Sequence, residues 1–116
     1  MLYEANLENL WLGEITKGRK TQEARLSKDK WSKMKVGDTI IFSGRNGYKA
    51  VVKIVSLRYY FNFTECYKAE GESLICSEIL GKFRITAESI YSCIYDDCDI
   101  NRYGVVSVGM NLIDFC

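Results

Sequence analysis

The segment Thr39–Leu57 restricts the fold more than any other part of the sequence. Two runs rich in β-branched and aromatic residues, Thr39–Phe42 and Tyr48–Leu57, flank a short loop that contains Asn46-Gly47. An Asn-Gly pair between two such runs is among the strongest local signals for a β-hairpin. We therefore expect two neighbouring antiparallel strands in the middle of the chain.

Shorter elements are expected on the N-terminal side of this hairpin. Residues 2–6 are typical of a short strand, and Gly18 follows a stretch whose apolar residues are spaced as in a helix. Residues 21–26 alternate as a strand does, and a turn or short helix with Trp31 and Met34 as apolar contacts is expected over 28–34. The apolar residues of the helical stretch are Leu7, Leu10, Trp11 and Ile15. Trp11 is therefore assigned to the core.

Helices and a last strand are expected on the C-terminal side. Asn62-x-x-Glu65 resembles a capping box and predicts a short helix through Lys68. Residues 70–85 are predicted to be irregular. Thr86 is suited to cap a second helix, with Asp96-Asp97 near its end. After Asn101–Gly104, residues 105–113 alternate as a closing strand.

Several short strands with helices at their margins indicate an α+β fold, in the form of a small mixed barrel with flanking helices. The 116 residues, of which 47% are hydrophobic and 27% charged, are enough for one core. We expect residues 1–116 to form a single domain. No apolar run approaches the roughly 18–20 residues of a membrane span, and Met1–Asn6 does not resemble a secretory signal. Membrane association is therefore not expected.

Cysteine and histidine usage limits the chemistry further. The chain has five cysteines, none in a C-x-x-C pair, and no histidine. We expect all five to be reduced thiols of an intracellular protein, cytoplasmic with the nucleus left open, and Cys93 to pack as a small hydrophobe. No metal site and no cofactor are predicted. Without histidine, a Ser-His-Asp or Cys-His arrangement cannot exist.

Basic residues are concentrated in the first half of the chain. Residues 1–59 carry twelve Lys/Arg and six Asp/Glu, whereas residues 60–116 carry four and nine. The segment Lys17–Lys35 alone has eight basic residues and two acids. Such an asymmetry is typical of a face that binds a polyanion, although a solvated lysine-rich loop gives the same pattern.

Charged side chains alternate along the expected strand 21–26. Thr21, Glu23 and Arg25 project from one face, because successive side chains of a strand point to opposite sides. The other face, with Gln22, Ala24 and Leu26, is only weakly apolar. The pattern leaves open whether Glu23 and Arg25 line a cleft or form an exposed pair of little energetic value.

Gly18-x-Lys20-x-x-Glu23-x-Arg25 resembles the G-x-K-x-x-E-x-R signature of the ASCH domain, a branch of the PUA-like superfamily. Two further segments are similar to that family in the same order: Lys35–Phe42 resembles its "GD-x-I-x-F" strand, and Asn101–Val106 resembles the start of its closing strand. The resemblance extends from Leu2 to about Ile113. It implies a PUA-like β-barrel in which the signature lines a cleft.

The resemblance also implies a role in binding RNA, a nucleotide or a nucleoside. Lys20 and Arg25 would meet phosphate, and Glu23 would accept a hydrogen bond from an exocyclic amine such as cytosine N4 or orient Arg25. Tyr103 is the first candidate for stacking on a base, followed by Trp31, Tyr59 and Tyr60. The full set of candidate ligand-binding residues is Gly18, Arg19, Lys20, Thr21, Glu23, Arg25, Arg102 and Tyr103.

Two alternatives remain. Some small relatives resemble hydrolases that act on acylated cytidine or on RNA through the signature lysine, and Lys20 with Glu23 would then be catalytic. In the amidohydrolase-like relatives a threonine stands where this chain has Glu23. They also have a second acid, for which Glu70, Glu72 and Glu78 are equal candidates. The other alternative is a protein-interaction module whose acidic half meets a basic protein partner.

Overall fold

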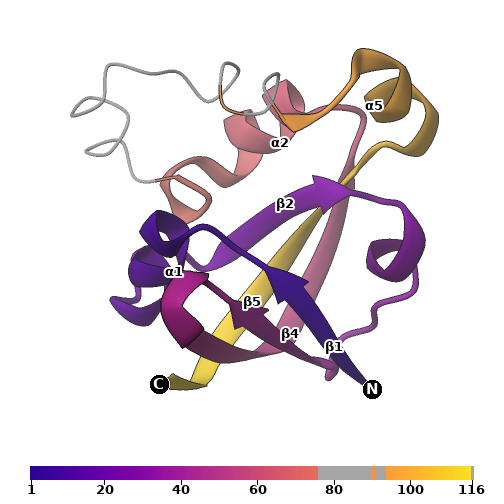
Figure 1. The fold of residues 1–116 in the computed structure, drawn as a ribbon. Helices are drawn as coiled ribbons and strands as arrows, with labels where there is room; N and C mark the ends of the chain where they lie inside the picture. The colour runs from indigo at the N-terminus through magenta and orange to yellow at the C-terminus, as the bar shows by residue number, and fades with distance from the viewer. Residues whose placement is uncertain (76–89, 91–93, 116) are drawn as a thin grey trace.

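The structure is a computed structural model that describes residues 1–75, 90 and 94–115. Its strands form one sheet in the order β1-β3-β4-β5-β2, in which β1 is parallel to β3 and the other neighbours are antiparallel. The sheet curves into a half-barrel whose free edges are β1 and β2 (Figure 1). This confirms the expected mixed α+β barrel. The strands are β1 (Leu2–Asn6), β2 (Gln22–Leu26), β3 (Thr39–Ser43), β4 (Lys49–Tyr60) and β5 (Val105–Phe115).

The central hairpin is the one that Asn46-Gly47 predicts. β3 pairs with β4 from Thr39 opposite Lys53 to Ser43 opposite Lys49. The loop between them is a 3-10 turn, η2 (Arg45–Gly47), in which Asn46 adopts a left-handed conformation with φ 62°. Asparagine tolerates this conformation better than most residues, so the turn has a local cause.

Two helices agree with the expected caps. α1 (Asn9–Thr16) begins slightly later than Leu7, and Gly18 follows it with φ 78°, a conformation that suits glycine. α2 (Phe63–Glu70) begins where the backbone N–H of Glu65 donates to the side chain of Asn62 at 2.8 Å. No helix in the described part of the chain has the length and apolar character needed to cross a bilayer.

α5 (Asp97–Tyr103) is a further helix that the sequence analysis did not predict. Asp96, which was expected near the end of the preceding helix, is the N-cap of α5, and its side chain accepts from the backbone N–H of Cys98 at 3.2 Å. Aspartate favours helix starts because it satisfies free N–H groups and the positive end of the dipole. The Thr86-capped helix, Cys93 and most of segment 70–85 lie outside the described residues.

Two apolar clusters lie on opposite faces of β2. The first fills the half-barrel under α1 and includes the Trp31 ring, stacked on Phe42 with centroids 6.4 Å apart. The second lies between β2 and α2 and contains Ala24 and Leu26. Because alternate residues face opposite ways, Glu23 and Arg25 project from the other face, away from this second cluster. The structure thus resolves an orientation that the sequence left open.

The opening between the free edges β1 and β2 is bridged by side chains. Arg25 donates from Nη2 to the carbonyl oxygen of Asn6 at 2.9 Å, and Lys30 donates to the carbonyl oxygen of Glu4. Lys30 belongs to the 3-10 helix η1 (Asp29–Ser32), which also carries the buried Trp31. A short helix was expected here. We call this side-chain bridge from Arg25 and Lys30 to β1 the seam.

Candidate functional site

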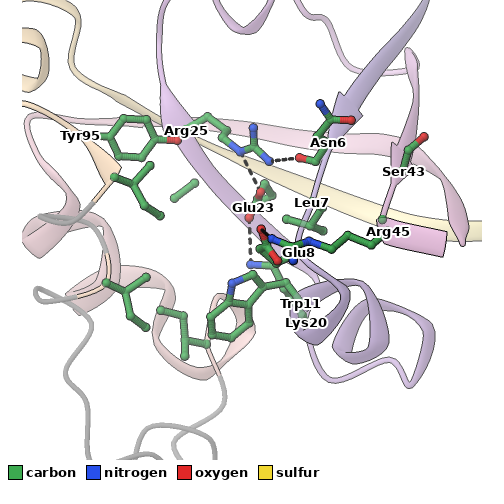
Figure 2. Close-up of a pocket in the computed structure, with 15 residues that line it drawn as sticks. Asn6, Leu7, Glu8, Trp11, Lys20, Glu23, Arg25, Ser43, Arg45 and Tyr95 are labelled. Atoms are coloured by element: carbon green, nitrogen blue, oxygen red, sulfur yellow. Dashed lines mark hydrogen bonds and ion pairs between the residues drawn. The ribbon is translucent and has the colours of Figure 1, made fainter. Parts of the chain in front are cut away.

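A cleft of about 420 Å³ opens beside β2. Its lining comes from segments far apart in the sequence, and the charged groups of β2 form its floor (Figure 2). The β1–α1 connection contributes Asn6 and Glu8, and η2 contributes Arg45. Trp11 of α1 and Tyr95 supply aromatic wall. The three signature side chains Lys20, Glu23 and Arg25 all take part in the lining.

Glu23 is the centre of the floor. One carboxylate oxygen lies 3.1 Å from the ammonium of Lys20, and the other accepts from Nε of Arg25 at 2.8 Å. The Glu23 side chain is only 9% exposed. A buried carboxylate between two cations can remain charged where a lone one would be neutralised.

The Lys20 ammonium has its donors directed at protein acceptors. Besides Glu23, it donates to the carbonyl oxygens of Gln22 at 2.7 Å and Leu74 at 2.8 Å. An ammonium has three N–H donors, so these contacts account for all of them. Nζ also lies 5.9 Å from the centre of the Trp11 ring, within cation–π range. Lys20 therefore holds the floor together and is poorly placed to meet a phosphate.

The loop after α1 places Lys20 in the cleft. The backbone N–H groups of Arg19 and Lys20 both donate to the carbonyl oxygen of Glu14 at 3.0 Å. The Arg19 guanidinium bonds the Glu14 carboxylate at 2.6 Å. With Gly18 in its left-handed conformation, the chain reverses at the end of α1 and directs Lys20 inward.

Arg25 connects the floor to the barrel core. Besides Glu23 and the Asn6 carbonyl, its guanidinium carbon lies 4.8 Å from the centre of the Trp31 ring. Arginine stacks well on an aromatic face because its guanidinium is planar and weakly hydrated. The buried Trp31 therefore supports Arg25 from below and is not a surface for stacking a base, which was one of its expected roles.

The electrostatics of the floor favour an ionised Glu23. Burial raises the pKa of this carboxyl, but the charges and hydrogen bonds of Lys20 and Arg25 outweigh burial and hold it below its usual value of 4.5. At neutral pH Glu23 is therefore a hydrogen-bond acceptor only. A carboxylate has about four acceptor sites, and each oxygen has one of the described partners, so it can accept from a ligand.

The other candidate residues of the segment Gly18–Arg25 shape the loop without lining the cleft. Gly18 provides the turn, and Arg19 is bound to Glu14. Thr21 is exposed, and its backbone N–H donates to the carbonyl oxygen of Ser73 at 2.9 Å. The structure thus brings Lys20, Glu23 and Arg25 together and gives the other three supporting positions.

Arg102 and Tyr103 lie apart from the cleft lining. Both are at the end of α5, where the Tyr103 ring contacts Arg102 and Lys28 at 5.3 and 5.2 Å from their cationic groups. Tyr59 is 61% exposed and Tyr60 is half-buried, and neither lines the cleft. The described lining therefore contains none of the three tyrosines that we considered for stacking.

The candidate second acids are not in the described cleft lining either. Both Glu70 carboxylate oxygens accept from the Arg58 guanidinium at 2.7 Å, and one also accepts from the Tyr60 hydroxyl at 3.0 Å. Glu72 is exposed. Glu78 lies outside the described residues. Glu70 is thus committed to a structural ion pair.

Sequence reasoning missed much of the cleft wall. Trp11, assigned to the core, is half-buried and faces the cleft over Lys20. Glu8 and Arg45 are 37 positions apart and meet at 3.3 Å on the rim. Their pairing could not be predicted from the sequence, because only the fold brings these two residues together. Tyr95 offered no signal at all, since nothing near it resembles a known motif.

No candidate metal-binding cluster is found in the described part of the chain. Residues 1–75, 90 and 94–115 contain no group of three or more Cys, Asp or Glu side chains arranged to hold an ion. Of the described cysteines, Cys66 is a buried free thiol and Cys98 an exposed one. Burial raises the pKa of Cys66 to about 12, so this thiol is protonated at neutral pH.

The comparisons with known proteins agree with this architecture. The family model described as "ASCH domain" matches residues 6–113. The chain is similar to the crystal structure of a hypothetical protein, PH0355, with 30% identity and a TM-score of 0.83. That match covers 97% of this chain and 100% of the other. A search of curated proteins gave no match.

Two other solved structures extend the likeness. The NMR structure of protein PF0455 from Pyrococcus furiosus is 27% identical with a TM-score of 0.73, over 98% of this chain and 99% of that one. The crystal structure of a mutant of the ASCH protein of Zymomonas mobilis has a TM-score of 0.54 over 96% of this chain and 66% of that one. Its 10% identity makes it evidence for the fold alone.

Proposed function

The chain belongs to the ASCH domain family with a PUA-like fold, and we propose that it binds RNA or a modified nucleotide by taking a base into the cleft beside β2. The observation that carries the proposal is the Lys20–Glu23–Arg25 cluster at the cleft floor, in which Lys20 and Glu23 are buried and Arg25 is half-buried. Burying Lys20 and Glu23 and partly burying Arg25 is costly, so a cluster of this kind at an open cleft points to a functional role.

The floor offers an acceptor to the ligand. Glu23 is kept ionised by its two cations, and its carboxylate can accept from an amino group on the edge of a base. Cytosine N4 is such a donor, whereas uracil O4 at the same position is an acceptor. We therefore infer that the floor prefers an amino-substituted base.

The walls suit a flat ring. Trp11 and Tyr95 line the cleft together with the apolar side chains Ile75 and Ile94. Bases of single-stranded RNA are commonly held by stacking on aromatic rings and by hydrogen bonds to their edges. A hydrogen-bonding floor between partly aromatic walls provides both kinds of contact.

The hydrolase alternative is less well supported. A lysine nucleophile or base needs a free lone pair, whereas the donors of Lys20 are all directed at protein acceptors. Glu23 replaces the threonine of the amidohydrolase-like relatives, and Glu70 is paired with Arg58. We expect no Lys20-dependent turnover when the pure protein is incubated with N4-acetylcytidine or labelled single-stranded RNA.

Calorimetric titration with cytidine, uridine and a short single-stranded RNA tests the binding proposal. We expect cytidine to bind more tightly than uridine, and Glu23→Gln to remove that preference, because the amide keeps the shape but loses the charge. One good base contact corresponds to about 1–3 kcal/mol, or roughly 5- to 150-fold. The control is Glu65→Gln, which makes the same change at an exposed carboxylate of α2 outside the cleft.

Two outcomes would overturn the proposal. One is an absence of binding by all three ligands at low salt. The other is a preference for cytidine that Glu65→Gln removes as fully as Glu23→Gln does, since charge alone would then account for it. If the protein co-purifies with a protein partner and without nucleic acid, that result supports the interaction-module alternative instead.

A further inference from the structure

Arg45 stands on the rim of the cleft in a fixed loop. Its backbone N–H donates to Oδ1 of Asn9 at 2.9 Å, and the left-handed Asn46 follows it in the turn. Gly44, just before it, packs so closely on Asn9 that an added Cβ would lie 2.1 Å from that same oxygen. The main chain at Arg45 is therefore anchored to the start of α1, while its long side chain extends over the cleft (Figure 2).

Arg45 differs from the two cations of the floor in exposure. Its side chain is 77% exposed, against 4% for Lys20 and 20% for Arg25. The floor cations are committed to Glu23 and to backbone carbonyls. Among the described residues that line the cleft, Arg45 is thus the cation that a ligand can reach without breaking a buried contact.

The partner of Arg45 is easy to displace. Arg45 Nη2 lies 3.3 Å from Oε1 of Glu8, whose side chain is itself 65% exposed. Exposed ion pairs are worth about 0–1 kcal/mol because water and salt screen them. Arginine binds phosphate through two parallel hydrogen bonds, which are stronger and more directional than this single long contact. A phosphate placed at the rim can therefore replace Glu8.

We propose that Arg45 forms a phosphate subsite at the rim of the cleft, where it exchanges Glu8 for a phosphate attached to the nucleoside whose base occupies the floor. This inference rests on the proposed function and assigns the anionic part of the ligand to a place apart from Lys20. Glu8 acts as a built-in competitor, because its carboxylate holds the guanidinium when no phosphate is bound. The phosphate is either a monoester of a free nucleotide or a diester of an RNA backbone.

Four probes test the subsite and separate these two sources. They are cytidine, cytidine 5′-monophosphate, cytidine 3′-monophosphate and the dinucleotide CpC, each titrated calorimetrically at one fixed low salt concentration. We expect at least one phosphorylated probe to bind more tightly than cytidine. A gain with a monophosphate identifies a monoester, and a gain confined to CpC identifies a backbone diester.

Three variants then test whether the gain in affinity comes from Arg45. Arg45→Ala should weaken the favoured phosphorylated probe by about tenfold, the value of one charge-assisted contact, and leave cytidine within about twofold. Glu8→Gln should strengthen the same probe, because it removes the competitor. Lys53→Ala matches the lost charge away from the cleft and should change neither. Both rim side chains are exposed, so the variants should fold, as circular dichroism can show.

The outcomes separate this inference from the proposed function. If cytidine binds but no phosphorylated probe binds more tightly, or if Arg45→Ala weakens cytidine and nucleotide equally, the rim subsite is wrong and base binding stands. If the phosphorylated probes gain affinity but Lys53→Ala removes as much of it as Arg45→Ala, the subsite is also wrong. If no probe binds, both proposals fall together.

Discussion

The ammonium of Lys20 lies 3.1 Å from the carboxylate of Glu23, and both side chains are shielded from water, 4% and 9% exposed. This pair forms part of the proposed base-binding floor, and the stability of the fold also depends on it. Removal of one partner from a buried ion pair leaves an uncompensated charge, whereas removal of both need not.

Lys20→Met should therefore lower the free energy of unfolding by about 3–5 kcal/mol. In the double variant with Glu23→Gln, part of that loss should return, because the buried carboxylate that has lost its Lys20 partner is removed as well. Urea denaturation of the two single variants and the double variant measures the coupling. A loss below about 1 kcal/mol in Lys20→Met would show that water reaches the ammonium, which would contradict the enclosed floor.

Acid should destabilise the protein partly through Glu23. Burial disfavours its charge, but Lys20 and Arg25 hold the folded-state pKa below the usual value of 4.5. Stabilisation from a lowered pKa is present above the unfolded pKa and is lost as the pH falls through the folded one. The free energy of unfolding should thus fall below about pH 4.5.

The Glu23→Gln variant isolates this contribution. Glu70, whose pKa the hydrogen bonds from Arg58 lower, and Asp38, whose pKa the backbone N–H of Lys35 lowers, titrate in the same direction in both proteins. Denaturation at a series of pH values from 3 to 7 should give a shallower acid slope for Glu23→Gln. Parallel slopes would mean that Glu23 is not held ionised by its neighbours.

Cys66 should resist alkylation in the folded protein. It is fully buried, and burial raises its pKa to about 12, so almost no thiolate exists at pH 8. Cys98 is exposed and should react with iodoacetamide under the same conditions. Mass spectrometry of tryptic peptides reports the two sites separately. Labelling in denaturant is the control, and rapid labelling of Cys66 without denaturant would refute its placement.

Two glycine-to-alanine changes should have opposite effects. A Cβ at Gly109 would lie 1.9 Å from Oγ of Ser56 and 2.8 Å from Nε2 of Gln22, whereas one at Gly13 meets nothing within 4 Å. Gly109→Ala should cost about 1–3 kcal/mol through overpacking of β5 against β2 and β4. Gly13→Ala should stabilise α1 by about 0.5–1 kcal/mol.

Thermal and urea denaturation compare the glycine variants with the wild type. Shortening the obstructing side chain with Ser56→Gly should restore part of the stability of Gly109→Ala. If Gly109→Ala is neutral on its own, the close packing of Ser56 and Gln22 around β5 is not as described.

The local features of the fold could be predicted from the sequence because their causes are local. Asn46-Gly47 fixed the hairpin, and Asn62 fixed the start of α2. α5 was not predicted because Asp96-Asp97 can lie both after one helix and at the start of the next, and only the first of these positions was considered. The N-cap contact of Asp96, at the positive end of the helix dipole, shows that the pair also begins α5.

The floor of the site could be predicted and its rim could not. Lys20, Glu23 and Arg25 lie within one segment, so strand alternation and the family signature were enough to group them. Glu8 and Arg45 meet only because β1 pairs with β3. The basic run Lys17–Lys35 suggested a polyanion-binding face, but four of its charges, those of Arg19, Lys20, Arg25 and Lys30, bond to acceptors within the protein.

The seam between β1 and β2 has a kinetic consequence. Main-chain ladders separate slowly, by local unfolding on microsecond to second timescales, whereas a side-chain hydrogen bond breaks when a single side chain changes rotamer. Because the seam consists of the side chains of Arg25 and Lys30 alone, this edge of the barrel can widen without a strand pair coming apart. A ligand can therefore enter or leave the neighbouring cleft without unfolding of the domain.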